Sequence, residues 1–272
     1  MEGEILLPIP IHMDEIPSEI MEYVNRIVSI RYPRQGHTSH VAIIESDQGI
    51  FALKRTKGKL FNYMVHQEVS ILNSLHETTQ LPVPRVKKFI QQHQHAQYWS
   101  LMDFIEGQTI RAALWNEHNN ERRQEIIFQF GAILSTIHAT PCPSEWMTNE
   151  QAWLDYMLNQ ATYNLNNDEV DGTAALLSKL IMNKPKQYKQ TFIHGDYTID
   201  NVIVSNGIIT GVIDWSSGAY GDPRYDASLA IRPKPNAFID KIDQQIFFEG
   251  YGERIINNDE YDYFANGLYE FF

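Results

Sequence analysis

The amino-acid sequence predicts an α+β protein with a small N-terminal lobe built on a β-sheet and a larger, mainly helical C-terminal lobe. The first hundred residues alternate strand-like and helix-like runs, whereas apolar residues at helical spacing dominate the rest. The charge divides in the same way. Residues 1–100 hold 10 Lys+Arg and 10 Asp+Glu, and residues 101–272 hold 12 and 24, so the whole net charge of −12 falls in the second part. We place the border at 104/105, which gives domains 1–104 and 105–272.

The composition is that of a soluble globular protein, with 43% hydrophobic and 21% charged residues. No apolar run approaches the roughly 20 residues of a membrane helix. Pro8 and Pro10 interrupt the N-terminal apolar segment, which lacks the basic start of a signal peptide. The single cysteine, Cys142, excludes an internal disulfide and a Cys-rich metal site. We therefore expect a cytoplasmic protein.

The acidic excess of the second lobe repels nucleic acid and anionic membrane surfaces, and it attracts cations. Solubility alone is the simpler explanation of surface acidity. Because the excess is confined to one lobe, we keep a cationic small molecule as the expected partner and expect no nucleic acid and no membrane.

Hydrophobic spacing predicts the elements of the first lobe. Apolar residues at helical intervals predict helices over 14–28 and 63–75. Strand-like runs come in two pairs, and Asp47-Gln48-Gly49 is the turn of the first pair. These strands are expected at 40–46, 50–55, 83–90 and 98–104.

The second lobe is expected to contain helices over 120–138, 150–165 and 172–183, and again from 237 to the end. Short strands are expected at 191–193, 202–204 and 208–213, the last two joined by an Asn206-Gly207 turn. His138 would end the first of these helices, where a positive charge suits the helix dipole.

The segment HGDYTIDNVIV at residues 194–204 carries the strongest chemical signal. A hairpin turning at Asn206-Gly207 would bring Asn201 next to Asp214. Amide and carboxylate oxygens at adjacent strand ends suit Mg²⁺ shared with phosphate oxygens. Asp196 would face this site, where it could accept a hydroxyl proton or orient a nucleophile. Taken singly, each residue is better explained as a turn or cap residue, and only their joint spacing indicates a site.

These residues resemble the signature motifs of the aminoglycoside phosphotransferase family, which is similar in fold to protein kinases. Kinases carry H-R-D-x-x-x-x-N and D-F-G, and the matching residues are His194, Asp196, Asn201 and Asp214. Gly195 and Trp215, in place of the kinase Arg and Phe, favour the small-molecule kinases. The resemblance implies a two-lobed protein-kinase-like fold, ATP and Mg²⁺ as cofactors, a nucleotide-binding first lobe, and a catalytic and substrate-binding second lobe.

The segment 221–226 resembles the G-D-P-x-x-D segment of the same family. By that resemblance Asp222 and Asp226 support the catalytic loop through hydrogen bonds. Helix capping is an equally good explanation of both residues.

The resemblance also implies nucleotide-binding residues in the first lobe. The loop 36–41 is similar to the phosphate-covering loop, with Ser39 reaching phosphate oxygens. Lys54 and Glu68 occupy the places of the paired lysine and glutamate, so Lys54 would bind the α- and β-phosphates. The segment 102–105 resembles the hinge, where Asp103 and Ile105 would contact adenine through their main chain.

The chain ends in Glu270-Phe271-Phe272, which resembles the end of the aminoglycoside 3′-phosphotransferases. By that resemblance Glu270 and the α-carboxylate of Phe272 bind substrate ammonium groups. Acidic residues at 168–171 and 259–262 could add a polyanionic rim. The alternative is a final helix that only packs, with Phe271 and Phe272 in the core.

Three hypotheses follow. The first is an ATP-dependent phosphotransferase that moves the γ-phosphate to a hydroxyl of an aminoglycoside antibiotic, and so a resistance enzyme. The second is a kinase of another small molecule, such as a macrolide, choline, homoserine or a sugar. The third, a nucleotide-binding module without catalysis, is disfavoured because every expected catalytic residue is present. The acidic lobe and the terminal Glu-x-Phe favour the first, acting as a monomer or homodimer. Asp200 has no role in this interpretation.

Overall fold

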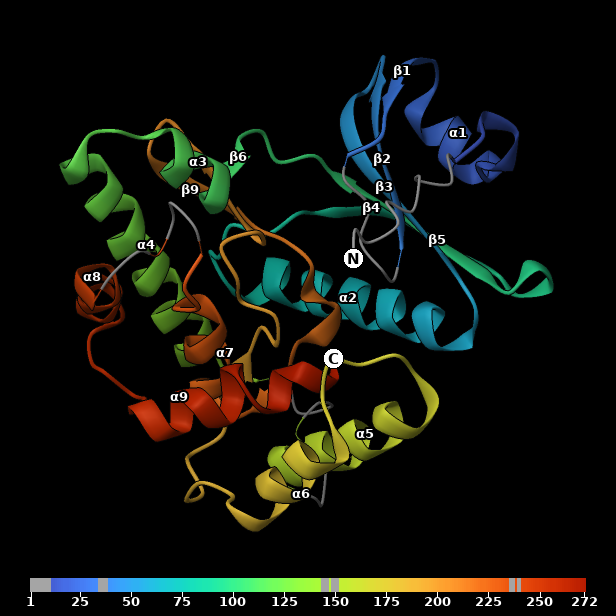
Figure 1. Ribbon diagram of the computed structural model, residues 1–272. Coiled ribbons are helices and arrows are strands. Elements are labelled where there is room, and N and C mark those ends of the chain that lie inside the picture. The colour runs from blue at the N-terminus through green and yellow to red at the C-terminus, as the bar shows by residue number, and fades with distance from the viewer. Residues whose placement is uncertain (1–10, 34–38, 143–146, 148–151, 235–237, 239–240) are drawn as a thin grey trace, which may run out of the picture. The chain divides into compact units, whose positions relative to one another are not determined.

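The computed structural model describes residues 11–33, 39–142, 147, 152–234, 238 and 241–272. The chain divides into two units, Met1–Ile105 and Glu106–Phe272, one residue later than the predicted border. The first unit is built on a sheet and the second is mainly helical (Figure 1). The α+β class is therefore confirmed.

The first unit contains an antiparallel sheet of five strands in the order β1-β2-β3-β5-β4. Buried residues of α1 and of β2, β3 and β5 form one core cluster, and α2 contacts β3, β4 and β5 (Figure 1). Successive side chains of a strand point to opposite faces. Neighbours on β3 therefore serve different faces: Arg55 reaches Glu15 on η1, whereas Lys54 reaches Glu68 on α2. The elements are η1 (Met13–Glu15), α1 (Ser18–Val24), β1 (Ile27–Arg31), β2 (His40–Ser46), β3 (Gly49–Lys57), α2 (Lys59–Thr78), β4 (Val86–Gln92), η2 (His93–His95) and β5 (Gln97–Asp103).

The predicted helix over 14–28 is wrong at both ends. Ile16 caps the short 3-10 helix η1, and Pro17 is the N-cap of α1. Asn25, with a φ of 59°, ends α1, and Ile27 already belongs to β1. Ile16, Ile20 and Val24 do face the core at helical spacing. The error arises because the apolar residues of a helix and of the next strand run on without an obvious break.

The second unit combines helices with two small sheets, β6-β8-β9 and β10-β7. Five of its elements, β6, α3, η4, β10 and α7, were not predicted, because two or three residues carry no measurable periodicity and the two helices are only about two turns long. The elements are β6 (Gln108–Thr109), α3 (Ile110–Asn116), α4 (Asn120–Ala139), α5 (Trp153–Asn167), α6 (Ala174–Met182), β7 (Thr191–Ile193), β8 (Val202–Ser205), β9 (Ile208–Val212), η4 (Trp215–Ser217), β10 (Ala219–Gly221), α7 (Pro223–Ala230), α8 (Lys241–Tyr251), α9 (Asn258–Ala265) and η5 (Leu268–Phe271).

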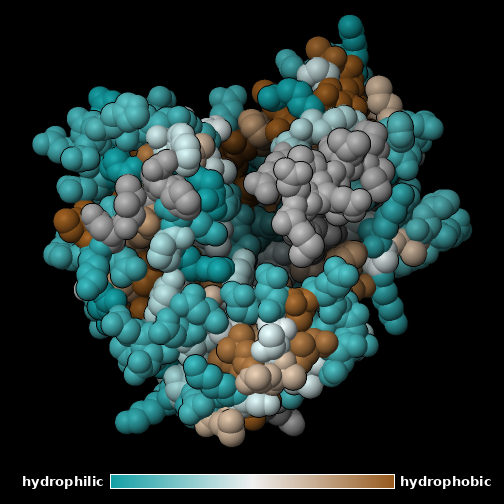
Figure 2. Space-filling model, in the orientation of Figure 1, coloured by the Kyte–Doolittle hydropathy of each residue, from teal (hydrophilic) through white to brown (hydrophobic). Residues whose placement is uncertain are grey.

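The face of the second unit in Figure 2 is mainly hydrophilic, with apolar residues gathered over α5 and α6. The large exposed apolar and aromatic side chains of these two helices are Tyr156, Tyr163, Ile181 and Met182. Among the described residues, none of the helices combines the length and the apolar character that crossing a membrane requires.

Helices α4 and α8 pack side by side because glycines let their backbones approach (Figure 1). A Cβ on Gly131 of α4 would lie 1.9 Å from the main-chain oxygen of Phe247, and one on Gly250 of α8 would lie 2.0 Å from that of Phe128. No real Cβ contact is that short. Each helix therefore needs glycine where it touches the other.

We expect Gly131→Ala to lower the free energy of unfolding by about 3 kcal/mol, because the added methyl group forces two backbones apart. Urea unfolding followed by circular dichroism measures the loss. Thr136→Ala, on an exposed part of the same helix, is the control and should change stability by less than about 0.5 kcal/mol. An equal effect of both substitutions would contradict the close packing.

Candidate active site

The loop of residues 194–201 leaves β7 and enters β8, and its first turn is tightly constrained. The buried His194 accepts the Asp196 N–H on Nδ1 at 3.2 Å, so Nε2 carries the proton and donates to the Ile213 carbonyl at 3.0 Å. Gly195 has a φ of 81°, and a Cβ there would lie 2.0 Å from the Ser217 oxygen. This crowding explains why glycine stands where kinases carry arginine.

Asp226 of α7 holds this turn from behind. Its carboxylate is fully buried and accepts the N–H groups of His194 at 2.7 Å and of Gly195 at 2.8 Å. Asp222 does something else: it caps α7 by accepting the Arg224 N–H at 3.0 Å. Of the two explanations left open by the sequence, loop support therefore applies to Asp226 and helix capping to Asp222.

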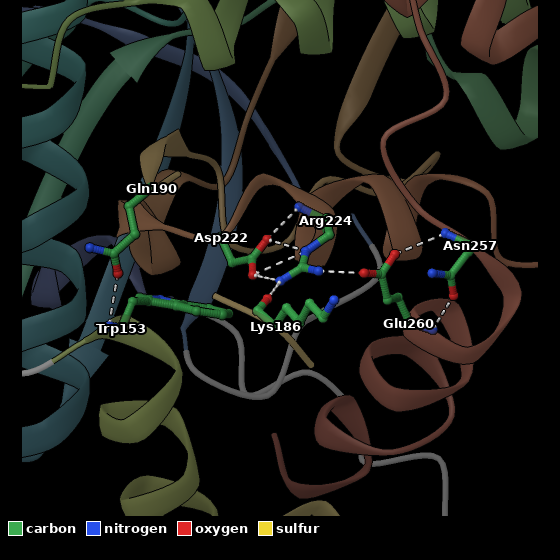
Figure 3. A network of polar contacts seen from close by, with 7 residues as sticks. All are labelled: Trp153, Lys186, Gln190, Asp222, Arg224, Asn257 and Glu260. Atoms are coloured by element: carbon green, nitrogen blue, oxygen red, sulfur yellow. Dashed lines mark hydrogen bonds and ion pairs between the residues drawn. The ribbon is translucent and has the colours of Figure 1, made fainter. Parts of the chain in front are cut away.

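Asp222 also belongs to a buried network around Arg224 (Figure 3). The Arg224 guanidinium binds the Asp222 carboxylate, the Lys186 carbonyl at 2.9 Å and the Glu260 carboxylate. Glu260 in turn accepts the Asn257 N–H in the capping box of α9. Glu260, which the sequence suggested for an acidic substrate rim, is thus already paired with a buried cation.

Asp196 and Asn201 are joined at the centre of the loop. Nδ2 of Asn201 donates to the main-chain oxygen of Asp196 at 2.8 Å and to its Oδ2 at 2.7 Å, which leaves Oδ1 of Asn201 as the atom for a cation. Oδ1 of Asp196 is buried and has no hydrogen-bond partner among the described residues. Burial, and then the charge of Asp214, raise the pKa of Asp196 to about 7, against the opposing hydrogen bond from Asn201.

Asp214 follows β9 and reaches the same loop. Asn206 and Gly207 both have positive φ, 53° and 80°, as the hairpin between β8 and β9 requires. Beyond the hairpin, the Ile213 N–H donates to the Asn201 carbonyl at 2.9 Å. Asp214 itself adopts a left-handed conformation with a φ of 65°. The hairpin thus brings Asn201 and Asp214 together.

Asn201 and Asp214 provide oxygen ligands of the kind that Mg²⁺ prefers. The like-charge interaction of Asp214 with Asp196 is a charge surplus that a cation would relieve. Within the described ranges, no cluster of three or more His, Cys, Asp or Glu side chains could hold a metal alone. The donor set therefore fits a Mg²⁺ ion that takes its remaining ligands from phosphate oxygens and water.

A pocket of about 170 Å³ lies beside Asp196 within the second unit. Its lining includes two cations, Arg232 and Lys234, and the ring of Tyr269. Burial, and then the charges of Arg232 and Arg111, lower the pKa of Lys234. The lining residues are Asp196, Thr198, Ile199, Asp200, Asn201, Leu229, Ala230, Arg232, Lys234 and Tyr269.

Asp200, which had no role in the sequence interpretation, forms a two-pronged ion pair with Arg111 of α3. The Arg111 N–H also donates to the Ile199 carbonyl at 3.0 Å. Asp200 therefore ties the 194–201 loop to α3. An arginine just after a Thr-capped helix start carries no sequence signal for such a contact.

The C-terminal segment borders the same pocket. The guanidinium carbon of Arg232 lies 4.5 Å from the centroid of the Tyr269 ring, and Nη2 of Arg232 lies 3.8 Å from Oε1 of Glu270. The Glu270 carbonyl accepts the Gly172 N–H at 2.7 Å, which brings the acidic 168–171 segment alongside. Phe271 is buried and Phe272 is 50% exposed, so core packing explains only the first of the two. The assignment of Glu270 and Phe272 to substrate stays a prediction.

In the first unit, Lys54 Nζ donates to Glu68 at 2.7 and 3.0 Å, and the glutamate is buried. Ser39 is partly exposed just before β2, and residues 36–38 of the expected phosphate loop lie outside the described residues. Asp103 donates its N–H to the Arg85 carbonyl at 3.0 Å and pairs with Lys87 at 2.9 Å, and Ile105 is partly exposed. Nucleotide contacts of these residues stay predictions.

Curated relatives match part of the chain. An aminoglycoside 3′-phosphotransferase of Enterococcus faecalis is 29% identical over 161 residues, 56% of this chain and 59% of the relative. One from Niallia circulans is 33% identical over 106 residues, 39% and 40% of the two chains. The matches therefore span less than two thirds of these relatives.

Solved structures and a family profile match a larger part of this chain than the curated relatives do. An aminoglycoside-3′-phosphotransferase of type VIII has a TM-score of 0.71 at 18% identity, over 91% of this chain and 93% of that one. A spectinomycin phosphotransferase in complex with ADP and spectinomycin has a TM-score of 0.64 at 18% identity, over 90% and 82%. At such identities these structures show the fold alone, which is the predicted kinase-like one. The family profile described as the phosphotransferase enzyme family matches residues 30–262. The chain belongs to that phosphotransferase enzyme family.

Proposed function

We propose that the protein is an ATP-dependent phosphotransferase that moves the γ-phosphoryl group to a hydroxyl of a small molecule. The observation that carries this proposal is the buried Oδ1 of Asp196, which lacks a partner in the described part of the chain and lies beside the oxygen ligands of Asn201 and Asp214. An acceptor hydroxyl would donate to this atom. Membership of the phosphotransferase family supports the same reaction.

In this mechanism Asn201 and Asp214 would hold Mg²⁺, and Lys54, fixed by Glu68, would bind the α- and β-phosphates of ATP. Bound Mg²⁺ supplies charge neutralisation on the transferred group. Asp196 positions the acceptor hydroxyl and takes its proton. Because phosphoryl transfer has a loose transition state, positioning matters more than deprotonation.

We propose an aminoglycoside as the acceptor class. The curated relatives are named aminoglycoside 3′-phosphotransferases. The exposed acidic segment 168–171 lies against Glu270, where it could bind ammonium groups. Arg232 and Lys234 in the pocket favour the second candidate, a less cationic acceptor such as a sugar or a macrolide. We further propose that the reaction takes place in the cytoplasm, with the chain as a monomer or homodimer.

A coupled ADP-release assay over aminoglycosides, macrolides, choline, homoserine and sugars tests the proposal. We expect aminoglycosides to stimulate ADP release well above the rate with ATP alone, and mass spectrometry to find the phosphorylated acceptor. Stimulation only by another acceptor would move the assignment to the second candidate. No stimulation by any acceptor would overturn the phosphotransferase assignment for this panel.

A further inference from the structure

His138 lies near the C-terminal end of α4, buried between two other helices of the second unit. Its Nδ1 lies 2.9 Å from the Tyr251 hydroxyl of α8, and its Nε2 lies 3.3 Å from Oδ2 of Asp226 on α7. The Tyr251 ring also meets the imidazole nearly edge-on, with centroids 5.6 Å apart. The sequence predicted only a favourable interaction with the helix dipole, whereas the side chain has two defined partners.

The chemistry of these partners determines the direction of the hydrogen bonds. An ionised carboxylate can only accept, so Nε2 of His138 carries a proton and donates it to Asp226. In the neutral imidazole, Nδ1 is then an acceptor, and the Tyr251 hydroxyl donates to it. The three side chains therefore form an ordered relay, from the Tyr251 hydroxyl through His138 to the Asp226 carboxylate.

Asp226 connects His138 to the 194–201 loop through hydrogen bonds. Its two oxygens accept the N–H groups of His194 and Gly195, the two residues before Asp196. A fully buried carboxylate is costly unless donors surround it. His138 adds a side-chain donor to that set, and it approaches the oxygen that also holds His194.

The packing of α4 on α8 explains why this relay can exist. Gly250, whose missing side chain lets α8 touch α4, directly precedes Tyr251. Gly131 makes the matching contact two turns before His138 on α4. The close approach of the two helices thus places the Tyr251 hydroxyl within hydrogen-bond distance of the imidazole.

We propose that His138, oriented by Tyr251, is a positioning residue that sets the place of Asp196 by holding the carboxylate of Asp226. The proposal rests on the proposed phosphotransferase function. It predicts that the loss of His138 reduces kcat and leaves substrate affinity almost unchanged, because none of the three relay residues lines the pocket beside Asp196. It also predicts that His138 acts only through Asp226.

A double-mutant cycle tests this proposal with ATP and the best acceptor of the panel. We expect His138→Leu to lower kcat about 30-fold, with the KM values of both substrates within about twofold, since small misplacements of reacting groups cost up to about 10²-fold. His138→Gln keeps an N–H near the position of Nε2 and should recover most of the rate. Adding His138→Leu to Asp226→Asn should lower kcat by less than about twofold further, because the shared interaction is already lost. His118→Gln, at an exposed histidine, is the matched control.

Hydrogen exchange separates this proposal from the proposed function. In His138→Leu the amides of His194 and Gly195 should exchange at least about tenfold faster than in the parent, and in His138→Gln close to the parent rate. This readout needs no turnover, so a protein without activity on any acceptor fails the function and still tests the relay. Unchanged exchange, equal kcat losses in the Leu and Gln variants, or independent effects of His138 and Asp226 would each overturn the proposal. The Gln variant keeps the test valid where the Leu variant does not fold.

Discussion

Asp196→Asn should abolish turnover and at the same time stabilise the ligand-free protein at neutral and alkaline pH. The amide keeps the volume of the side chain and can still accept the Asn201 hydrogen bond. It cannot take a proton from the acceptor, so we expect kcat to fall by about 10²–10⁴-fold in the ADP-release assay. The stability gain follows because the amide carries no charge next to Asp214 and Asp226.

The sign of the pH dependence follows from the raised pKa. Asp196 has a pKa of about 7 in the folded protein against an ordinary value of 3.8. Between these values the folded state binds more protons than the unfolded state, so the stability of the parent falls as the pH rises. The advantage of Asp196→Asn should therefore be absent below about pH 4, grow up to about pH 7, and then stay level at about 4 kcal/mol.

Urea unfolding of both proteins at pH 5 and pH 8, without nucleotide or Mg²⁺, measures this difference. Asp14→Asn, at an exposed carboxylate, is the control and should shift neither midpoint. If the Asp196→Asn variant and the parent unfolded at the same urea concentration at pH 8, the charge on Asp196 would not destabilise the folded protein. A loss of stability at pH 8 would contradict the argument outright.

The residues predictable from sequence were those whose partners lie close along the chain. Asp196 and Asn201 share one loop, and a two-residue turn brings Asp214 to them. The contacts from distant elements were not predictable. Arg111 is 89 residues from Asp200, and His138 is 113 residues from Tyr251, so no local spacing connects them. Such pairs depend on how helices pack, which hydrophobic periodicity alone does not specify.

Counting charges had a similar limit. The acidic excess of residues 101–272 was real, but the count could not distinguish a carboxylate free to bind substrate from one already paired inside the protein. Glu260 belongs to the Arg224 network, and Glu270 faces Arg232. The pocket beside Asp196 has cations in its lining, although its lobe is acidic. Net charge therefore describes the surroundings of a site better than its lining.

The second large effect is expected in the first unit, at the ion pair between Lys54 and Glu68. Glu68→Ala removes a buried carboxylate from a lysine whose side chain is only 14% exposed. Breaking a buried pair on one side leaves the remaining charge poorly compensated and costs about 3 kcal/mol. We expect this loss in urea unfolding, together with a raised KM for ATP. Glu77→Ala, exposed on the same helix, is the matched control and should have neither effect.

Replacing both members of the pair separates stability from function. The double variant Lys54→Met with Glu68→Leu has no buried charge to compensate, so its stability should return to within about 1 kcal/mol of the parent. Its turnover should nevertheless stay at least about 10²-fold below the parent, because it lacks Lys54, the residue proposed to bind the α- and β-phosphates. A stable double variant with near-normal kcat would show that the pair serves the fold alone. A double variant as unstable as Glu68→Ala would instead show that the pair contributes through contacts other than charge.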